Sequence, residues 1–450
     1  MTRPRRILFT IINYHPYGFG GGQQYVSHLA KELKRRGYAV AVMTLLQQAW
    51  QNTEGKKGEI VPYVEEGIDV FGLSIDSRFL TQGEKYAVNH PLLRSMIKDV
   101  VQEFSPDLIH LNGMNTATFT VTNELGIPTI ATIHHSGVAC PAGALMYHDE
   151  TICPHSMHHD VCIACCSYQR IPQSRLLGFA VGKIPRWLYM PFGKRFDTTK
   201  KMPLPFRVLH YPWLVEQEME QLRMGLNISH TFIAPSDAIK KLLIRNGVLE
   251  NRIRMVPHGV SHLTKFQIPP FDGRPVRFGY VGHVGSIKGF HILTAALEIV
   301  SETTNCELHV YGDTDGNEYY SSTMKQYKGK AKIIPHGFVR EEQLQEAYNS
   351  FDVLVLPSLA HEAFGLVVNE ALAVGRPVIV SNSGALPELV KAEYGMVVER
   401  NNVDSLAQAM QRCAADPHEI LAMSGRIPDV KKIDRYVDEM ENLYANTGDH

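Results

Sequence analysis

Two carboxylates, Glu362 and Glu370, lie eight residues apart in the stretch "HEAFGLVVNEALAVGRPVIV". On one continuous helix they would point about 80° apart, at about 100° per residue. We instead expect Glu362 in a loop and a helix that begins near Gly365, with Glu370 one to two turns inside it. The N–H groups at such a helix start can hold an anion, and carboxylates accept hydrogen bonds from sugar hydroxyls. Spacing alone, however, favours two solvated acids at a helix start.

Two glycine-rich turns each follow an apolar run. Gly20, Gly21 and Gly22 come after "RRILFTII", and "GHVGSIKG" comes after "PVRFGYV". Glycine allows a ligand to approach the backbone closely, and the N-terminus of the following helix attracts phosphate. Lys288, at the end of the second turn, is a natural partner for a diphosphate, because a cation is disfavoured at a helix N-terminus unless an anion is near. The alternatives are a tight turn without a ligand and a solvated lysine.

The order strand, glycine turn, helix occurs twice along the 450 residues. In the first half we expect strands at 5–12 and 39–46 around a helix at 23–38, whose apolar stripe is Val26, Leu29, Ala30 and Leu33. In the second half we expect strands at 306–312, 331–337, 351–358 and 377–382. This alternation predicts an α/β protein with two doubly wound parallel sheets, joined by the proline-rich stretch 261–275. Ligands of such sheets bind at the carboxyl ends of the strands.

The composition of the chain favours some classes of protein and argues against others. Hydrophobic residues make up 44% and charged residues 20% of the chain, as in soluble globular proteins. A net charge of −1 argues against a nucleic-acid-binding protein. No apolar run is long enough to span a bilayer. The basic N-terminus precedes only a short apolar run with no cleavage site, so we expect a strand there, a cytoplasmic protein and reduced cysteines.

Several motifs together resemble one enzyme family. "EAFGLVVNE" matches the E-x7-E signature of the retaining GT-B glycosyltransferases of family 4, and "DVLVLPS" before it fits the same setting. "GGGQQYVSHLAKELKRRGYAVAVMT", "FIAPSDAIKKLLIRNGVLENRIRMVPHGV" and "GYVGHVGSIKGFHILTAAL" resemble the family's glycine loop, pre-linker segment and donor-binding loop. The resemblance runs in order over nearly the whole chain. It implies a GT-B fold of two Rossmann-like domains facing a cleft, at 1–262 and 263–432, with a terminal helix at 433–450 that packs back on the first domain.

The resemblance also implies roles for single residues. Glu362 would contact hydroxyls of the transferred sugar, Lys288 would neutralise the leaving diphosphate, and His134 would lie near the sugar and the acceptor. The donor-binding residues would be Gly20, Gly21, Gly22, His283, Phe338, Val339, Phe364, Gly365, Leu366 and Glu370, of which Glu370 would bind the ribose. The acceptor side would contain Gln23, His110 and Asn112.

Two of these positions depart from the family. His283 stands where an arginine is usual, and a neutral imidazole binds a diphosphate more weakly than a guanidinium does. Gln23 stands where a glutamate is usual, which bears on acceptor contacts rather than on the chemistry.

The implied reaction moves a sugar from a UDP- or GDP-sugar to a hydroxyl of a glycan, glycolipid or small-molecule acceptor, in cell-envelope polysaccharide biosynthesis. Preorganised N–H groups and Lys288 would stabilise the departing diphosphate. Catalysis would then need no cofactor and no dedicated base. Two alternatives are a GT-B phosphorylase or hydrolase of a sugar nucleotide, and a non-catalytic binding module on the same fold. We expect Asp313 and Asp315, in "GDTDG", to form a polar loop rather than a metal site.

Five cysteines, at positions 140, 153, 162, 165 and 166, fall within 27 positions of an insertion at about 138–206. Thiolates at this spacing suit a tetrahedral structural zinc ion, and we take Cys140, Cys153, Cys162 and Cys165 as its ligands. Interleaved histidines could substitute. An iron–sulfur cluster, free thiols and disulfides are the alternatives. The spaced cysteines also resemble an insertion in a subset of the family.

The following stretch, 175–196, mixes aromatic, aliphatic and basic residues. It could touch anionic lipid at the inner face of a membrane, or form helices packed on the first domain. Pro185 and Pro191 interrupt any long amphipathic helix and favour packed helices.

Overall fold

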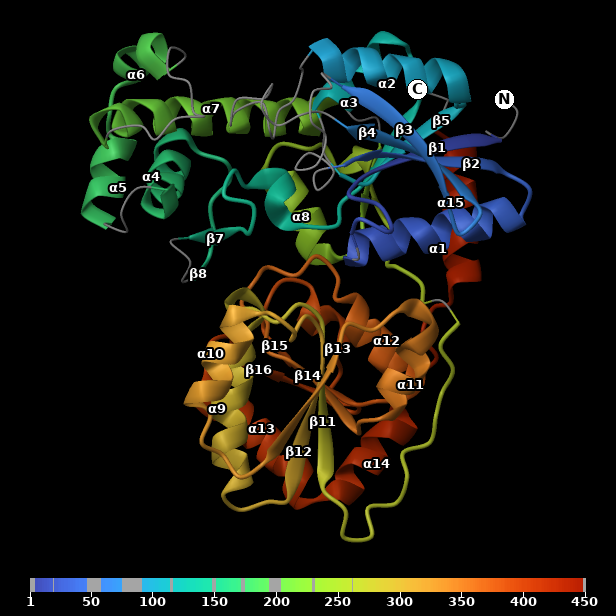
Figure 1. The fold of residues 1–450 in the computed structure, drawn as a ribbon, viewed down its shortest axis with the longest axis vertical. Coiled ribbons are helices and arrows are strands. Elements are labelled where there is room, and N and C mark those ends of the chain that lie inside the picture. Colours follow the sequence, from blue (N-terminus) through green and yellow to red (C-terminus); the bar gives the residue numbers. More distant parts are fainter. Residues whose placement is uncertain are drawn as a thin grey trace. The chain divides into compact units, whose positions relative to one another are not determined.

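The computed structural model describes residues 5–18, 20–46, 58–74, 91–113, 116–147, 151–170, 175–193, 204–228, 231–260 and 262–447. The chain divides into two compact units (Figure 1). Unit 1 comprises residues 1–257 and 433–450, and unit 2 comprises residues 258–432. Each unit is built on a largely parallel sheet, and the α/β fold with two parallel sheets predicted from the sequence is confirmed.

The sheet of unit 1 has the strand order β10-β9-β6-β5-β1-β2-β4-β3. Its neighbouring strands are parallel except β3, which is antiparallel to β4. The strands are β1 (Arg6–Ile12), β2 (Ala39–Leu45), β3 (Glu59–Glu65), β4 (Ile68–Ser74), β5 (Leu108–Leu111), β6 (Thr129–Thr132), β9 (Thr231–Ala234) and β10 (Ile253–Met255). The helices beside them are α1 (Gly21–Arg35), α2 (Pro91–Phe104), α3 (Thr116–Glu124) and α8 (Asp237–Arg245).

The apolar stripe predicted for the first helix faces the core of unit 1. Val26, Leu29, Ala30 and Leu33 of α1 are all fully buried. They pack in one cluster with β1, β2 and the last helix, α15 (Ile433–Ala445). Arg36 fastens α15 to the end of α1, because its Nη1 atom lies 2.6 Å from carboxylate oxygens of both Asp438 and Glu441.

The β3–β4 hairpin was not predicted from the sequence. Its two-residue turn places Glu66 at φ 49° and Gly67 at φ 78°. Turns with two left-handed residues match the twist of a hairpin, and a glycine is favoured in them. The Glu-Gly pair between two apolar runs was the signal that could have revealed it.

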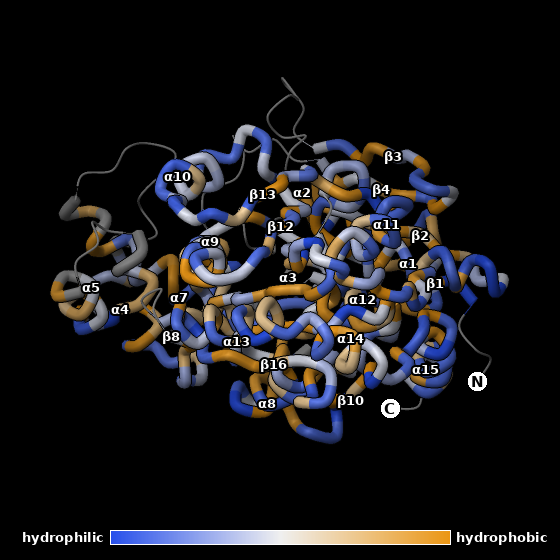
Figure 2. The backbone as a smooth tube through the Cα atoms, turned by 90° about the horizontal axis from the view of Figure 1, so that it is seen from below, coloured by the Kyte–Doolittle hydropathy of each residue, from blue (hydrophilic) through white to orange (hydrophobic). Residues whose placement is uncertain are grey.

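The crossover from β6 to β9 contains the cysteine-rich insertion. It includes η3 (Ser136–Ala139), a small hairpin of β7 (Met146–Tyr147) and β8 (Thr151–Ile152), and four helices. These are α4 (His159–Arg170), α5 (Arg175–Gly182), α6 (Arg186–Gly193) and α7 (Leu204–Ile228). The long helix α7 packs against α4, α5 and α6, drawn in green in Figure 1. The apolar colouring of α5 is visible in Figure 2.

The sheet of unit 2 has the order β13-β12-β11-β14-β15-β16 and is parallel throughout. Its strands are β11 (Val276–Val281), β12 (Cys306–Tyr311), β13 (Lys332–Gly337), β14 (Val353–Leu356), β15 (Val378–Ser381) and β16 (Gly395–Val398). The four strands predicted for the second half of the chain are therefore confirmed. Its helices are α9 (Phe290–Ser301), α10 (Glu318–Gln326), α11 (Leu344–Asn349), α12 (Leu366–Val374), α13 (Val403–Ala415) and α14 (Pro417–Arg426), with short 3-10 turns η5 (Ser286–Lys288), η6 (Glu341–Gln343) and η7 (Leu386–Leu389).

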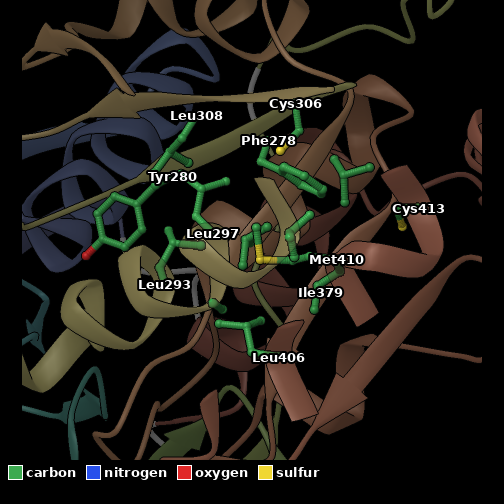
Figure 3. Packing of buried hydrophobic residues seen from close by; sticks show 14 of the residues in the cluster. Phe278, Tyr280, Leu293, Leu297, Cys306, Leu308, Ile379, Leu406, Met410 and Cys413 are labelled. Atoms are coloured by element: carbon green, nitrogen blue, oxygen red, sulfur yellow. The ribbon is translucent and has the colours of Figure 1, made fainter. Parts of the chain in front are cut away.

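Apolar side chains fill both faces of this sheet. On one face α9 and α13 pack against the strands around Phe278, Leu297, Leu308 and Met410 (Figure 3). On the other, α11 and α12 bury Tyr348, Val368 and Ala371. The chain order along the sheet reverses between β11 and β14, which are neighbours. This reversal creates a topological switch point, where the loops after two adjacent strands separate and leave room for a ligand.

Candidate active site

Lys288 and Glu362 meet at the switch point of unit 2. Lys288 ends η5 in the loop after β11, and Glu362 lies in the loop after β14. The Lys288 Nζ atom lies 2.6 Å from Glu362 Oε1, with the two side chains 30% and 14% exposed. Ser358 donates a second hydrogen bond to the same oxygen, at 2.5 Å. The ammonium group is therefore held in place by a carboxylate and is still partly accessible to a ligand.

The two loops are locked together through their backbones. The N–H of Leu359 donates to the carbonyl of Ile287 at 2.9 Å. Gly289, at φ 73°, lies so close to the loop after β14 that a Cβ atom there would be 2.0 Å from the carbonyl oxygen of Pro357. Only glycine fits at this position, and the contact fixes Lys288 relative to the loop that carries Glu362.

A third loop holds the backbone of Glu362. The N–H of Ala385, which follows β15, donates to the Glu362 carbonyl at 2.9 Å. Gly384 lies directly against the same peptide, because a Cβ atom there would be 2.2 Å from Glu362 O. Loops after three adjacent strands thus converge on one residue, Glu362.

Helix α12 begins where the sequence predicts it. Gly365 caps the helix in a left-handed conformation, with φ 95°. Val368 and Asn369 donate to the Gly365 carbonyl, at 3.0 and 3.2 Å, so the earlier N–H groups of Leu366 and Val367 precede the first intrahelical bonds. The positive end of the helix dipole lies at the same point.

Glu370 lies inside α12 and is 8% exposed. Its Oε2 atom accepts a 2.6 Å hydrogen bond from the hydroxyl of Tyr348 on α11. Burial, and then the neighbouring carboxylate, raise the pKa of Tyr348 well above its usual value, so the hydroxyl stays protonated and donates. Tyr348 therefore orients the carboxylate that we expected to bind ribose.

His283 lies in the loop after β11, where the family has an arginine. Its Nδ1 atom is 2.8 Å from Asp313 Oδ2, and 64% of its side chain is exposed. The other oxygen of Asp313 accepts the N–H of Val284 at 2.7 Å. Asp313 therefore belongs to a polar loop that supports the loop after β11, which is the arrangement we expected for "GDTDG".

Phe338 and Val339 follow β13, the edge strand of the sheet. Phe338 is 50% exposed, and Val339 packs partly against the core. Two strands separate β13 from β14. The structure thus places this predicted base-binding loop at the edge of the sheet. Phe364, another predicted donor-binding residue, directly precedes Gly365, and its side chain is buried against the ring of His258.

In unit 1 the structure brings four predicted residues together at the carboxyl ends of β1, β5 and β6. His134 Nε2 lies 2.9 Å from Asn112 Oδ1. A Cβ atom on Gly22 would be 3.6 Å from the His134 ring. Gln23 donates to the carbonyl of Ile12, at the end of β1, at 2.8 Å. Gly20 and Gly21 form the start of α1 beside them.

His110 lies beneath this group rather than at the acceptor surface where we expected it. Its side chain is fully buried. Nδ1 is 2.8 Å from the hydroxyl of Tyr444, and Nε2 is 2.7 Å from Thr132 Oγ1. Burial, with a smaller contribution from His134, lowers the pKa of His110 to about 3, so the ring is neutral. Both nitrogens are engaged in the core, which leaves His110 no atom for an acceptor.

The four cysteines predicted as metal ligands all lie in the described part of the chain, and none of the four forms a disulfide bond. Cys162 interacts electrostatically with Cys140, Cys153 and Cys165. Within the described ranges, no three His, Cys, Asp or Glu side chains already stand in a metal-binding arrangement. His148, one of the interleaved histidines that could substitute for a cysteine, lies outside the described residues.

Sequence reasoning missed Ser358, Tyr348 and Gly384. Ser358 is four residues before Glu362, and its hydroxyl beside an expected loop carboxylate was a usable signal. Tyr348 and Gly384 lie in other elements, and nothing in the local sequence marks them as partners of Glu370 and Glu362.

No helix in the ranges that the structure describes is long and apolar enough to cross a membrane.

Comparisons with known proteins agree on one family. Residues 262–426 match the model described as "Glycosyl transferases group 1", and residues 20–159 match "Glycosyl transferase 4-like domain". An uncharacterized glycosyltransferase of Methanocaldococcus jannaschii, MJ1607, is 36% identical over 138 residues, which are 30% of this chain and 35% of that protein. The chain thus spans about a third of the length of that relative.

A second relative and a solved structure extend the similarity. The capsular polysaccharide biosynthesis glycosyltransferase CapM of Staphylococcus aureus is 26% identical over 303 residues, 61% of this chain and 74% of CapM. The structure of Anabaena Alr3699/HepE in complex with UDP and glucose has a TM-score of 0.60 and 16% identity, and the match covers 98% of this chain and 99% of HepE. At this identity the structural match shows the fold, which is GT-B. With two family models matched in order over both units, the chain belongs to the group 1 glycosyltransferases of the GT-B fold.

Proposed function

We propose that the protein is a retaining glycosyltransferase that moves a sugar from a UDP- or GDP-sugar to a hydroxyl of a glycan or lipid-linked acceptor in cell-envelope polysaccharide synthesis. The observation that carries the proposal is the Lys288–Glu362 pair at the switch point of unit 2, in which Lys288 comes from the loop after β11 and Glu362 from the loop that leads into α12. An ammonium group and free N–H groups suit a diphosphate, and a carboxylate beside them suits sugar hydroxyls.

Charge development dictates the roles of these groups. Breaking the bond between the anomeric carbon and the phosphate oxygen places negative charge on the diphosphate. Lys288 and the N–H groups of Leu366 and Val367 stabilise that charge where it forms. Glu362 orients the sugar through its hydroxyls, and Glu370, held by Tyr348, binds the ribose. The acceptor hydroxyl attacks on the face that the diphosphate leaves and gives its proton to the departing phosphate oxygen, so the configuration is retained.

Residues of unit 1 would serve the acceptor. The Oδ1 atom of Asn112 accepts a hydrogen bond from Nε2 of His134 and so orients the imidazole ring. The centre of that ring lies 4.6 Å from the centre of the Tyr25 ring. We assign His134 to the neighbourhood of the transferred sugar, and Gln23 and Asn112 to the acceptor side. The similarity to CapM supports a polysaccharide or its lipid-linked precursor as the acceptor.

We also propose a cytoplasmic location with peripheral contact to an anionic membrane. Leu176, Phe179 and Trp187, on α5 and α6, are 84%, 64% and 72% exposed. Lys183 lies near them, with Nζ 5.7 Å from the centre of the Phe179 ring. Exposed aromatic and aliphatic side chains beside basic residues favour the boundary between lipid headgroups and acyl chains. A lipid-linked acceptor would be reached there.

Calorimetric titration with UDP, GDP and the corresponding monophosphates tests the donor site. We expect one diphosphate to bind more tightly than its monophosphate. Lys288→Gln should weaken that binding about 10- to 150-fold, since a hydrogen bond to a charged group contributes about 1.5–3 kcal/mol. Lys330→Gln is the matched control, because Lys330 pairs with Glu302 at 2.7 Å on the surface, with the two side chains 66% and 58% exposed. It should change affinity by no more than about twofold.

Equal binding by both variants would refute the assignment of Lys288. Once a donor and an acceptor are identified, NMR spectroscopy of the product reports the anomeric configuration, and an inverted linkage would refute the retaining mechanism. Release of free sugar from the donor at the same rate with and without acceptor would favour a hydrolase instead.

A further inference from the structure

His258 is a buried histidine that the proposed reaction does not use. It is the first residue of unit 2, directly after Pro257. It is only 3% exposed, whereas histidine residues in general are fully buried less often than aliphatic ones. Removing a polar ring from water costs free energy that its contacts in the core must offset. Those contacts therefore indicate the role of His258.

The ring of His258 packs against the ring of Phe364. The two ring centres lie 5.0 Å apart, and the ring planes are inclined at 71°. Edge-to-face packing of this kind is a favourable arrangement of two aromatic rings. Phe364 is 6% exposed and directly precedes Gly365, which caps α12. His258 thus supports the last residue before the helix cap.

The backbone around His258 is itself fixed within unit 2. The Nδ2 atom of Asn369, inside α12, donates a long hydrogen bond of 3.4 Å to the His258 carbonyl. Two residues further on, the N–H of Val260 donates to the carbonyl of Lys431 at 2.9 Å. The side chain of Val260 is buried in the same apolar cluster as Val368 of α12. The segment that carries the imidazole ring therefore cannot shift without breaking contacts to α12.

Other contacts fix the residues on both sides of Phe364 but do not involve its ring. On one side, the N–H of Ala385 donates to the carbonyl of Glu362 at 2.9 Å. On the other, a Cβ atom on Gly365 would lie 2.7 Å from Cδ2 of Leu386. Both contacts come from the segment after β15. The ring of Phe364 is supported separately, by His258.

A displacement of Phe364 would move the groups proposed to bind the diphosphate. Leu366 and Val367 carry the N–H groups that precede the first intrahelical bonds of α12, and Leu366 is only two residues after Phe364. Such groups stabilise a developing charge only when they are aimed at it in advance. A misplacement of about 1 Å in a site can cost a factor of about 100 in rate.

We propose that His258 is a positioning residue of the diphosphate site. Its ring holds Phe364 in place and so aims the N–H groups of Leu366 and Val367. His258 acts through Phe364 and touches no atom of the donor. The inference rests on the proposed function, because it concerns the support of a site that the proposed function fills with a diphosphate.

Calorimetric titration of full-length variants tests this role, with pyrophosphate and with UDP or GDP, whichever binds more tightly. His258→Ala should weaken binding of both ligands about tenfold, well below the roughly 100-fold that a misplacement of about 1 Å can cost. Leu406→Ala is the matched control, because Leu406 is fully buried on α13, in the apolar cluster on the other face of the sheet. It should lower stability but change both affinities by no more than about twofold.

Two further variants separate positioning from a general loss of stability. His258→Phe keeps an aromatic edge against Phe364 and should bind both ligands nearly as well as the unmodified protein. Phe364→Leu removes the other ring of the pair and should weaken both titrations. Adding Phe364→Leu to His258→Ala should cost no more affinity than one of the two changes alone, because both break the same contact. Losses that add up fully would overturn the inference.

All affinities are compared at a temperature at which circular dichroism shows every variant folded. If His258→Ala does not fold, His258→Leu takes its place, since it keeps most of the buried volume without the aromatic edge. Equal binding by this variant and the unmodified protein, with Lys288→Gln still weakened, would overturn the inference and leave the proposed function standing. An equal loss in Leu406→Ala would also overturn it. Normal binding by Lys288→Gln would instead refute the donor site itself.

Discussion

Replacing Gly384 by alanine should displace Glu362 without touching its side chain. Gly384 has φ 58°, and an added Cβ atom would lie 2.2 Å from the carbonyl oxygen and 2.5 Å from the nitrogen of Glu362. Both are backbone atoms, so no rotamer change can relieve the overlap. The peptide of Glu362 must move, and with it the carboxylate that holds Lys288.

The loss of unfolding free energy expected for Gly384→Ala has two parts, which a control variant can separate. The left-handed conformation costs alanine about 1–2 kcal/mol. Overpacking that forces a backbone shift typically costs about 1–3 kcal/mol more. Gly316→Ala bears only the first cost, because Gly316 has φ 69° and open space around the added atom. We expect Gly384→Ala to lose about 2–5 kcal/mol of unfolding free energy, and Gly316→Ala about 1–2 kcal/mol.

Urea unfolding and calorimetric titration with UDP or GDP measure both consequences. Gly384→Ala should be less stable than Gly316→Ala and should bind the nucleoside diphosphate at least about tenfold more weakly, which is about 1.4 kcal/mol. If the two variants are equally stable and bind equally, the contact with Gly384 does not position Glu362, and the reasoning from three converging loops fails.

Three further expectations concern single side chains. Tyr348→Phe removes the hydroxyl group that donates to Glu370, and it should weaken binding of the nucleotide but not of pyrophosphate. Tyr327→Phe, which removes a hydroxyl that donates to the Ala331 carbonyl, should change neither titration. Because burial lowers the pKa of His110 to about 3, the unfolded state binds more protons than the folded state below about pH 6.5. Stability should then fall by up to about 1.4 kcal/mol per pH unit as acid is added, and His110→Gln should flatten that slope in acid unfolding curves. Trp187→Ser should lower co-sedimentation with anionic vesicles, and unchanged sedimentation would contradict membrane contact through α6.

The sequence predicts a site residue well when that residue lies in the loop directly after a strand that the sequence pattern reveals. Lys288 and Glu362 each follow a strand that reads as a continuous apolar run, and in a parallel sheet such loops emerge at one edge. What the sequence does not state is that β11 and β14 are neighbours. The family resemblance implied that both residues serve one donor, and the 2.6 Å contact between their side chains depends on the adjacency of the two strands.

Residues that position the site were harder to predict. Gly384 acts through a close approach between two loops, and Tyr348 acts from the helix before β14. A glycine in a polar loop and a tyrosine in a short helix occur in many proteins for other reasons. Their roles follow only from three-dimensional contacts, since neither has a periodicity or spacing that indicates a partner.

His110 illustrates a different limit. In a strand buried on both faces, apolar and polar positions do not alternate, so the sequence cannot tell which side chain reaches a ligand. The decisive partner, Tyr444, is 334 positions away on α15. A second tyrosine of α15, Tyr436, lies 2.5 Å from the hydroxyl of Tyr25, whose ring packs on His134. The terminal helix thus satisfies buried His110 and, through Tyr25, supports the half-buried His134. If His134 serves the acceptor as we propose, the tyrosines of α15 act there as positioning residues.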